Sequence, residues 1–86
     1  MADVVKYNVE EDVRNLVAEI LETEPVEIKD DAHFVKDLGM DSMMALELMA
    51  TLEKKYRIII AEDSLPKMTS LNATAEIVKN VLKNKQ

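Results

Sequence analysis

The sequence predicts an all-α fold: a small four-helix bundle with three main helices, one short helix and a long loop between helices 1 and 2. Two observations predict it. Apolar residues recur at helical spacing in three segments of the 86-residue chain, as on the buried face of an amphipathic helix. Each segment also begins near a residue that caps helices well, namely Asn8, Asp41 or Ser70. The expected helices cover residues 9–23, 41–56, 63–68 and 70–84.

The first predicted helix carries an apolar stripe made of Val13, Leu16, Val17, Ile20 and Leu21. Acidic residues fill its first turn, where the helix dipole favours negative charge. We expect the helix to end near Thr23, because Pro25 disfavours helical geometry in the residue before it.

The second predicted helix is apolar around most of its circumference. Leu48, Leu52 and Tyr56 share one stripe, which Ala45, Leu46 and Met49 broaden. A helix with this pattern is buried on several sides. Methionines at helical spacing are usually core residues, and we expect this of Met49 and Met68. Met44 is expected to be the exposed apolar contact for a partner or cargo.

The connecting segments contain scattered apolar residues that would otherwise face water. Residues 24–40 form a long connection, which favours packing on the core, and we expect Phe34, Leu38 and Ile60 to be buried. Gly39, the only glycine, is expected to supply a backbone angle that other residues resist. Residues 57–61 are β-branched and suit an extended crossing segment.

Composition limits the possible functions. The chain is expected to form a single domain over residues 1–86, with 48% apolar residues, and to be a monomer. Its net charge of −6 repels nucleic acid and anionic membranes, so the expected partners carry basic patches. No apolar run is longer than that of residues 58–61, which is too short to cross a bilayer. The amino-terminal residues lack the apolar stretch of a secretory signal, so the expected compartment is the cytoplasm.

The residues give little support to catalysis by this chain. Ser42 has no evident general base, because the only histidine, His33, lies in the long loop without an arrangement that would orient it. We interpret His33 as a solvated loop residue, and the adjacent Asp30 and Asp31 as solvated acids. The absence of cysteine, together with a single histidine, argues against a transition-metal site.

Ser42 is instead placed to be modified by another enzyme. As the first residue of a helix it presents its hydroxyl next to free backbone N–H groups and the positive end of the helix dipole, a favourable place for a phosphate ester. The spacing alone leaves a second interpretation open, in which Asp41 and Ser42 only start the helix.

Residues 37–56 read DLGMDSMMALELMATLEKKY. This stretch resembles the prosthetic-group site of acyl carrier proteins, whose pattern is an acidic residue, Leu, Gly, one variable residue and then Asp-Ser-Leu. The order of the predicted elements resembles that family over nearly the whole chain. The resemblance implies that Ser42 receives 4'-phosphopantetheine from coenzyme A, delivered by a phosphopantetheinyl transferase. The arm's thiol would hold acyl groups as thioesters for acyl-loading and acyl-processing enzymes, and the chain itself would not be an enzyme.

The resemblance also implies which residues meet partner enzymes: Asp37, Asp41, Met43, Met44, Glu47, Glu53, Lys54 and Lys55. Met43 replaces the usual leucine after the serine, a change that conserves volume. Lys54 and Lys55 stand where acids are common in the family. These lysines are either neutral surface substitutions or the mark of a carrier with a restricted set of partners.

The function that this resemblance implies is an acyl carrier for fatty-acid, lipid or polyketide-type synthesis, either general or specialised. Two alternatives stay open: an unmodified helical interaction module with the same architecture, and an aminoacyl or peptidyl carrier.

Overall fold

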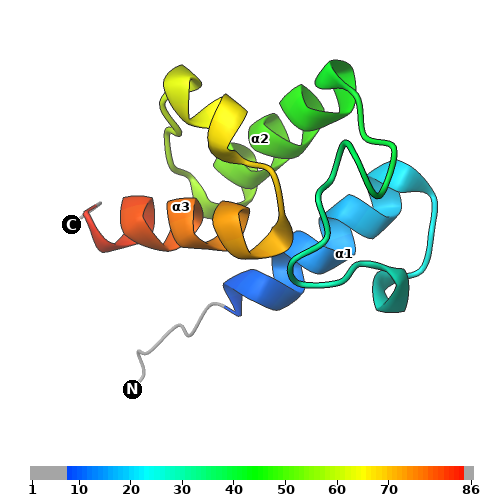
Figure 1. Ribbon diagram of the computed structural model, residues 1–86. Coiled ribbons are helices and arrows are strands. Elements are labelled where there is room, and N and C mark those ends of the chain that lie inside the picture. The colour runs from blue at the N-terminus through cyan, green and yellow to red at the C-terminus, as the bar shows by residue number, and fades with distance from the viewer. Residues whose placement is uncertain (1–7, 85–86) are drawn as a thin grey trace.

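The computed structural model describes residues 8–84, in which all regular secondary structure is helical (Figure 1). The elements are α1 (Val9–Leu21), η1 (Pro25–Glu27), α2 (Ser42–Tyr56), η2 (Glu62–Lys67) and α3 (Leu71–Lys83), where η denotes a 3₁₀ helix. The predicted all-α fold, with three main helices and a short one before the last, is confirmed. The turn η1 was not predicted, because Pro25 was interpreted only as the end of the preceding helix.

All three predicted caps are present. The side chains of Asn8, Asp41 and Ser70 accept hydrogen bonds from the backbone N–H three residues later, at 3.1, 2.9 and 3.2 Å. Helix α1 ends at Leu21, earlier than predicted, because Glu22 takes a left-handed conformation with φ of 57°. That geometry returns backbone N–H groups to the carbonyls of the last turn and stops the helix.

The core lies where α1 packs against both α2 and α3. Its fully buried side chains come from all three helices and from the loops; the largest are Tyr56, Phe34, Ile28, Leu48, Leu52 and Leu71. Burying each such side chain contributes roughly 1.5–3 kcal/mol. Two polar contacts connect the helices around this core. The Tyr56 hydroxyl donates a hydrogen bond to the Asp12 carboxylate, and the Lys79 ammonium forms an ion pair with Glu10. The hydrogen bond from Lys79 lowers the pKa of Glu10.

The long connection between α1 and α2 is anchored along its length. Arg14 donates to the carbonyl of Ile28 and to the carboxylate of Asp30. Further along, the N–H of Phe34 donates to the carbonyl of Thr69 at 2.7 Å. The predicted burial is confirmed for Phe34 and Ile60, whereas Leu38 is only half-buried.

Helix α2 is less buried than predicted. Met49 and Met68 are core residues as expected, but Met43 and Leu46 are 75% and 45% exposed. The expectation that Met44 would be the exposed methionine is wrong, since Met44 is half-buried against the core. One side of α2 therefore presents apolar side chains to solvent.

Thr74 provides a test of the packing. It is fully buried in α3, and its hydroxyl has no hydrogen-bond partner among residues 8–84. A buried hydroxyl without a partner costs roughly 1–3 kcal/mol. Replacing it with the similarly sized valine is therefore expected to raise the free energy of unfolding by about 1 kcal/mol in urea denaturation.

The matched control is Thr51→Val. The Thr51 hydroxyl donates to the carbonyl of Glu47 at 2.8 Å, so removing it relieves no unpaired group. A Thr74→Val protein that unfolds at lower urea than the parent would contradict the explanation.

Candidate functional site

Ser42 is the first residue of α2 and its side chain is exposed. The preceding residue, Asp41, is extended and its carboxylate accepts the N–H of Met44 at 2.9 Å. No hydrogen bond within residues 8–84 involves the Ser42 hydroxyl, so the cap of α2 is provided by Asp41 alone. The hydroxyl is therefore free to react at the positive end of the helix.

The backbone leading to Ser42 is held on both sides of Gly39. Gly39 has φ of 78°, a left-handed conformation that confirms the expected role of this glycine. The next residue, Met40, is buried, and its N–H donates to the carbonyl of Phe34 at 2.9 Å. This anchor fixes where α2 begins and so positions Ser42.

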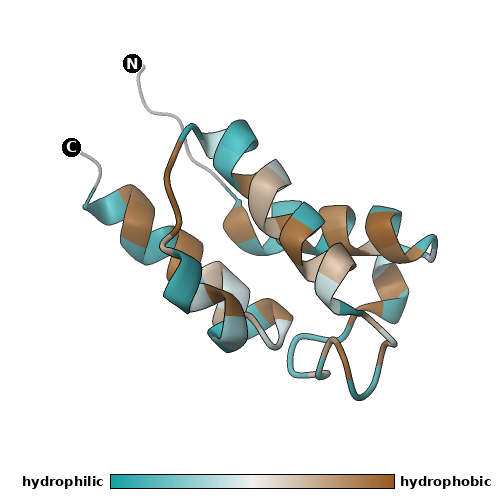
Figure 2. Ribbon diagram, turned by 90° about the horizontal axis from the view of Figure 1, so that it is seen from above, coloured by the Kyte–Doolittle hydropathy of each residue, from teal (hydrophilic) through white to brown (hydrophobic). Residues whose placement is uncertain are grey.

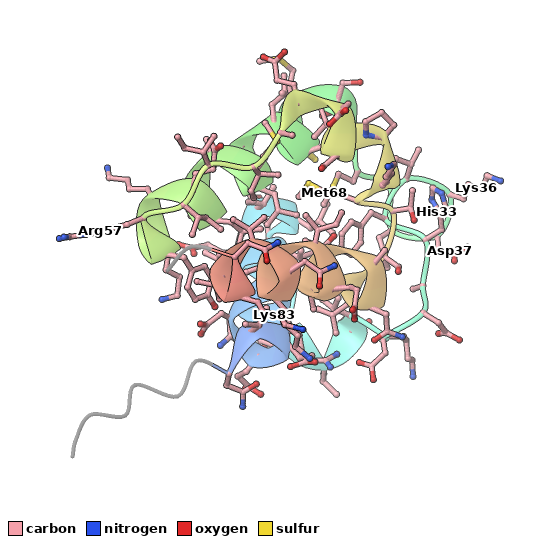
Figure 3. All side chains as sticks on the ribbon, turned by 90° about the vertical axis from the view of Figure 1, so that its left-hand side faces the viewer. His33, Lys36, Asp37, Arg57, Met68 and Lys83 are labelled. Carbon is pink, nitrogen blue, oxygen red and sulfur yellow. The ribbon has the colours of Figure 1, made fainter. Side chains whose placement is uncertain are left out.

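His33 and Asp37 close the turn that precedes Gly39. The Nδ1 atom of His33 accepts hydrogen bonds from the backbone N–H groups of Val35 and Lys36 at 3.2 and 3.1 Å. The backbone N–H of His33 donates to the Asp37 carboxylate at 2.8 Å. Figure 3 shows the side chains of His33, Lys36 and Asp37 together at one side of the molecule. His33 is a loop residue, as interpreted from the sequence, but it is half-buried, and its Nδ1 atom stabilises the turn.

A surface pocket of about 480 Å³ opens beside Ser42, between this turn, the first turn of α2 and η2. Apolar side chains line much of it, and polar groups stand among them. Its lining residues are His33, Val35, Lys36, Met40, Asp41, Ser42, Ala45, Leu65, Pro66, Met68 and Thr69. Most of these residues were not predicted as part of the site, because the loop and η2 are far apart in the sequence.

The residues predicted to meet partners fall into separate groups. Met43, Met44 and Glu47 lie in the first two turns of α2, directly after its cap Asp41. Lys54 and Lys55 lie exposed in its last turn, about 18 Å along the helix from Ser42. Three of the four predicted acids have hydrogen-bond partners within the chain, and one of these is Asp41, the cap of α2. Asp37 binds the turn described above, and Glu53 is half-buried, with its carboxylate accepting the N–H of Ile60 at 2.8 Å.

Residues 8–84 contain no group of three or more His, Asp or Glu side chains that could hold a metal ion. Among the same residues, no helix combines the length and apolarity needed to span a bilayer.

The family model described as phosphopantetheine attachment site matches residues 11–78. The chain belongs to the acyl carrier protein family. Acyl carrier proteins are carriers and not enzymes, and 4'-phosphopantetheine is the group that they carry. The site fits this group, because an exposed hydroxyl at a helix N-terminus suits a phosphodiester and lies next to a pocket with apolar walls.

Similar proteins share this assignment. The chain is 44% identical over 72 residues to Polyketide-8 synthase acyl carrier protein 2 of Streptomyces avermitilis, covering 84% of this chain and 83% of that protein. It is 37% identical to an acyl carrier protein of a Sulfurovum species, covering 83% and 95%.

Among solved structures, the HMG-ACPI domain of the CurA module from Lyngbya majuscula has a TM-score of 0.75 at 22% identity, covering 100% of this chain and 93% of the domain. The oxytetracycline acyl carrier protein has a TM-score of 0.76 at 22% identity, covering 96% and 90%. At these identities the two structures show that the fold is shared.

Proposed function

We propose that Ser42 is the attachment point of the 4'-phosphopantetheine arm in this acyl carrier protein. The observation that carries the proposal is the exposed Ser42 hydroxyl at the start of α2, which makes no hydrogen bond within residues 8–84. Its neighbour Asp41 caps the helix, so the serine is not needed to hold the fold.

The chemistry at Ser42 needs no base from this chain. The Ser42 oxygen attacks the phosphorus of coenzyme A next to the pantetheine, a P–O bond forms, and the nucleotide leaves with the electron pair of the broken bond. The modifying transferase takes the hydroxyl proton. What this chain contributes is the position of the hydroxyl and the free N–H groups and dipole of α2, which stabilise the new phosphodiester.

Once attached, the arm supplies a thiol that carries acyl groups as thioesters. The pocket beside Ser42 gives the base of the arm a surface with apolar walls, and Lys36 places a cation at its edge. On this proposal the pocket holds part of the arm or cargo between visits to partner enzymes.

The exposed side of α2 provides a docking surface for those enzymes. Met43 is 75% exposed, and Leu46 and Ala50 are exposed one and two turns further along. Glu47 is the exposed acid on the same helix. The partners are a phosphopantetheinyl transferase and acyl-loading and acyl-processing enzymes, which would meet this surface with apolar and basic side chains.

For the pathway we propose a carrier of polyketide-type synthesis before one of general fatty-acid synthesis. The 44%-identical relative, named as part of a polyketide synthase, supports this choice, as do Lys54 and Lys55 where the family commonly has acids. We further propose that residues 1–86 act as one cytoplasmic, monomeric domain that binds no nucleic acid, consistent with the net charge of −6.

The test is intact-protein mass spectrometry after incubation with coenzyme A and a broad-specificity transferase. The carrier gains the mass of one phosphopantetheine group. If several transferases add nothing, the chain is instead an unmodified interaction module. Subsequent loading with acyl or aminoacyl donors separates an acyl carrier from an aminoacyl or peptidyl carrier.

A further inference from the structure

A second exposed apolar feature lies at the end of α2 far from Ser42. Arg57 ends the helix in a left-handed conformation with φ of 55°, and an extended segment follows. Ile58 and Ile60 are buried in this segment, whereas Ile59 is 86% exposed. Figure 2 shows the segment as an apolar ribbon between the hydrophilic end of α2 and the next helix.

The extended segment forms one wall of a groove. We define the Ile59 groove as the hollow of about 380 Å³ lined by Arg57, Ile58, Ile59, Val81 and Asn84. Its other wall is the last turn of α3. The groove thus offers two apolar side chains from different elements, Ile59 and Val81, to a single ligand.

The backbone of Ile59 is also unpaired. The N–H groups of Ile58 and Ile60 both donate to Glu53, at 3.0 and 2.8 Å. Within residues 8–84, no backbone hydrogen bond involves the N–H or carbonyl of Ile59. In an extended segment alternate residues direct these groups to opposite sides, so those of Ile59 are available to an added strand.

The charge at the end of α2, where Arg57 begins the groove, is opposite to that of the chain as a whole. Although the net charge is −6, Lys54, Lys55 and Arg57 are three exposed cations within four positions. None of them belongs to an ion pair with another described residue. The acid closest in sequence, Glu53, is engaged by the backbone of Ile60.

We propose that the Ile59 groove binds an extended, acidic segment of a partner protein. The segment pairs with the backbone of Ile59, places an apolar side chain between Ile59 and Val81, and directs carboxylates at Arg57 and the two lysines. Apolar side chains that fill a pocket supply most of the binding free energy of such a contact, and the charges increase the association rate.

The position of the groove gives it a use distinct from docking near the arm. Helix α2 has 15 residues, so its ends are about 22 Å apart. Figure 3 shows Arg57 pointing outward on the side opposite His33 and Lys36. A partner bound at the groove leaves Ser42 accessible. Such a partner would tether the carrier while the arm on Ser42 is in use. This purpose rests on the proposed function, whereas the binding itself does not.

The test begins with selection of random 12-residue phage-displayed peptides on the immobilised, unmodified full chain. Enriched sequences are expected to alternate apolar residues with Asp or Glu. Synthetic fluorescent copies of them are then titrated by fluorescence polarisation. Ile59→Ser is expected to weaken binding about fivefold, as for loss of one apolar anchor. Arg57→Gln is expected to weaken it about twofold and to reduce its salt dependence.

The control is Val26→Ser, which removes another exposed apolar side chain, 79% exposed in η1, and should leave the affinity unchanged. Enriched peptides that lack acids, that bind Ile59→Ser as tightly as the parent, or that are equally weakened by Val26→Ser overturn the proposal. The proposal is also overturned if no peptide is enriched. It is overturned as well if sedimentation shows self-association that depends on Ile59, because the groove would then bind a second copy of the chain. The Ser42→Ala protein and the modified protein are expected to bind the selected peptides with equal affinity. Peptide binding at the groove is then independent of Ser42, so a failure of the carrier assignment would leave it unchanged.

Discussion

A Ser42→Ala protein is expected to stay at its unmodified mass under conditions in which the parent gains one phosphopantetheine group. The substitution removes the Ser42 hydroxyl at the start of α2, while the hydrogen bond from the N–H of Met44 to the Asp41 carboxylate remains. Alanine is also a good helix former. The free energy of unfolding should therefore change by less than about 0.5 kcal/mol, so loss of loading reports chemistry and not misfolding.

Two other serines provide matched controls. Ser64 lies half-buried in η2, and Ser64→Ala should load as the parent does. Ser70 caps α3, with its hydroxyl accepting the N–H of Ala73 at 3.2 Å. Ser70→Ala should therefore also load, but should cost about 1 kcal/mol of stability in urea denaturation.

The outcome that sinks this assignment is a Ser42→Ala protein that still gains the group. Modification would then lie at another side chain, and tryptic fragments would locate it. The free Ser42 hydroxyl would in that case be a surface residue at a helix start, the plainer interpretation that its spacing left open.

The helices were predictable because their signals are local. A capping side chain accepts the N–H of the residue three positions later. Apolar residues at helical spacing likewise lie within a single segment of the chain. The errors arose where conformation depends on one residue or on distant contacts. The left-handed Glu22 shortens α1, and no pattern distinguishes it from the helical residues before it.

The exposure of α2 could have been predicted more accurately. Met44 lies four residues before Leu48 and eight before Leu52, on the row of side chains that a helix directs to one side. That spacing places Met44 towards the core and leaves Met43, one position away, on another side. The sequence contained this signal, and the apolarity of the whole helix obscured it.

The pocket beside Ser42 had no comparable signal. It exists because the Phe34 N–H donates to the carbonyl of Thr69, which brings the loop before α2 against the segment after η2. The internal role of Glu53 is similar, since its bond to the N–H of Ile60 forms only when the chain turns back at Arg57. Such contacts depend on the packed fold.

Replacing both Lys54 and Lys55 with glutamate is expected to raise the rate at which a general fatty-acid elongation enzyme elongates the loaded carrier at low salt. Both lysines are exposed at the end of α2, where they weaken attraction to a basic partner surface. Each exposed contact is worth roughly 0.2–1 kcal/mol. Two contacts therefore total about 0.4–2 kcal/mol, and the upper part of this range is on the order of a tenfold change in affinity. The measurement is the elongation rate of the loaded carrier at low and at high salt, where screening should remove the gain.

The control must separate partner contacts from helix stability. Cations in the last turn of a helix interact favourably with its dipole, so the glutamates should also lower stability by about 0.3–1 kcal/mol each. The double glutamine variant removes the cations without adding acids, and its elongation rate should fall between those of the parent and the glutamate variant. Loading should be equal in all three, because Asp41, Ser42 and Glu47 are unchanged at the other end of the helix.

The same lysines connect partner choice to the Ile59 groove. If they were retained to bind an acidic segment there, the glutamate pair should weaken the selected acidic peptides while it improves elongation. Weaker peptide binding together with faster elongation is the result expected of a carrier whose charges favour its own partners over a general synthase. Equal elongation of the parent and the glutamate variant at low salt would remove the physical basis for a specialised carrier. The family assignment would stand, and the lysines would be neutral surface substitutions.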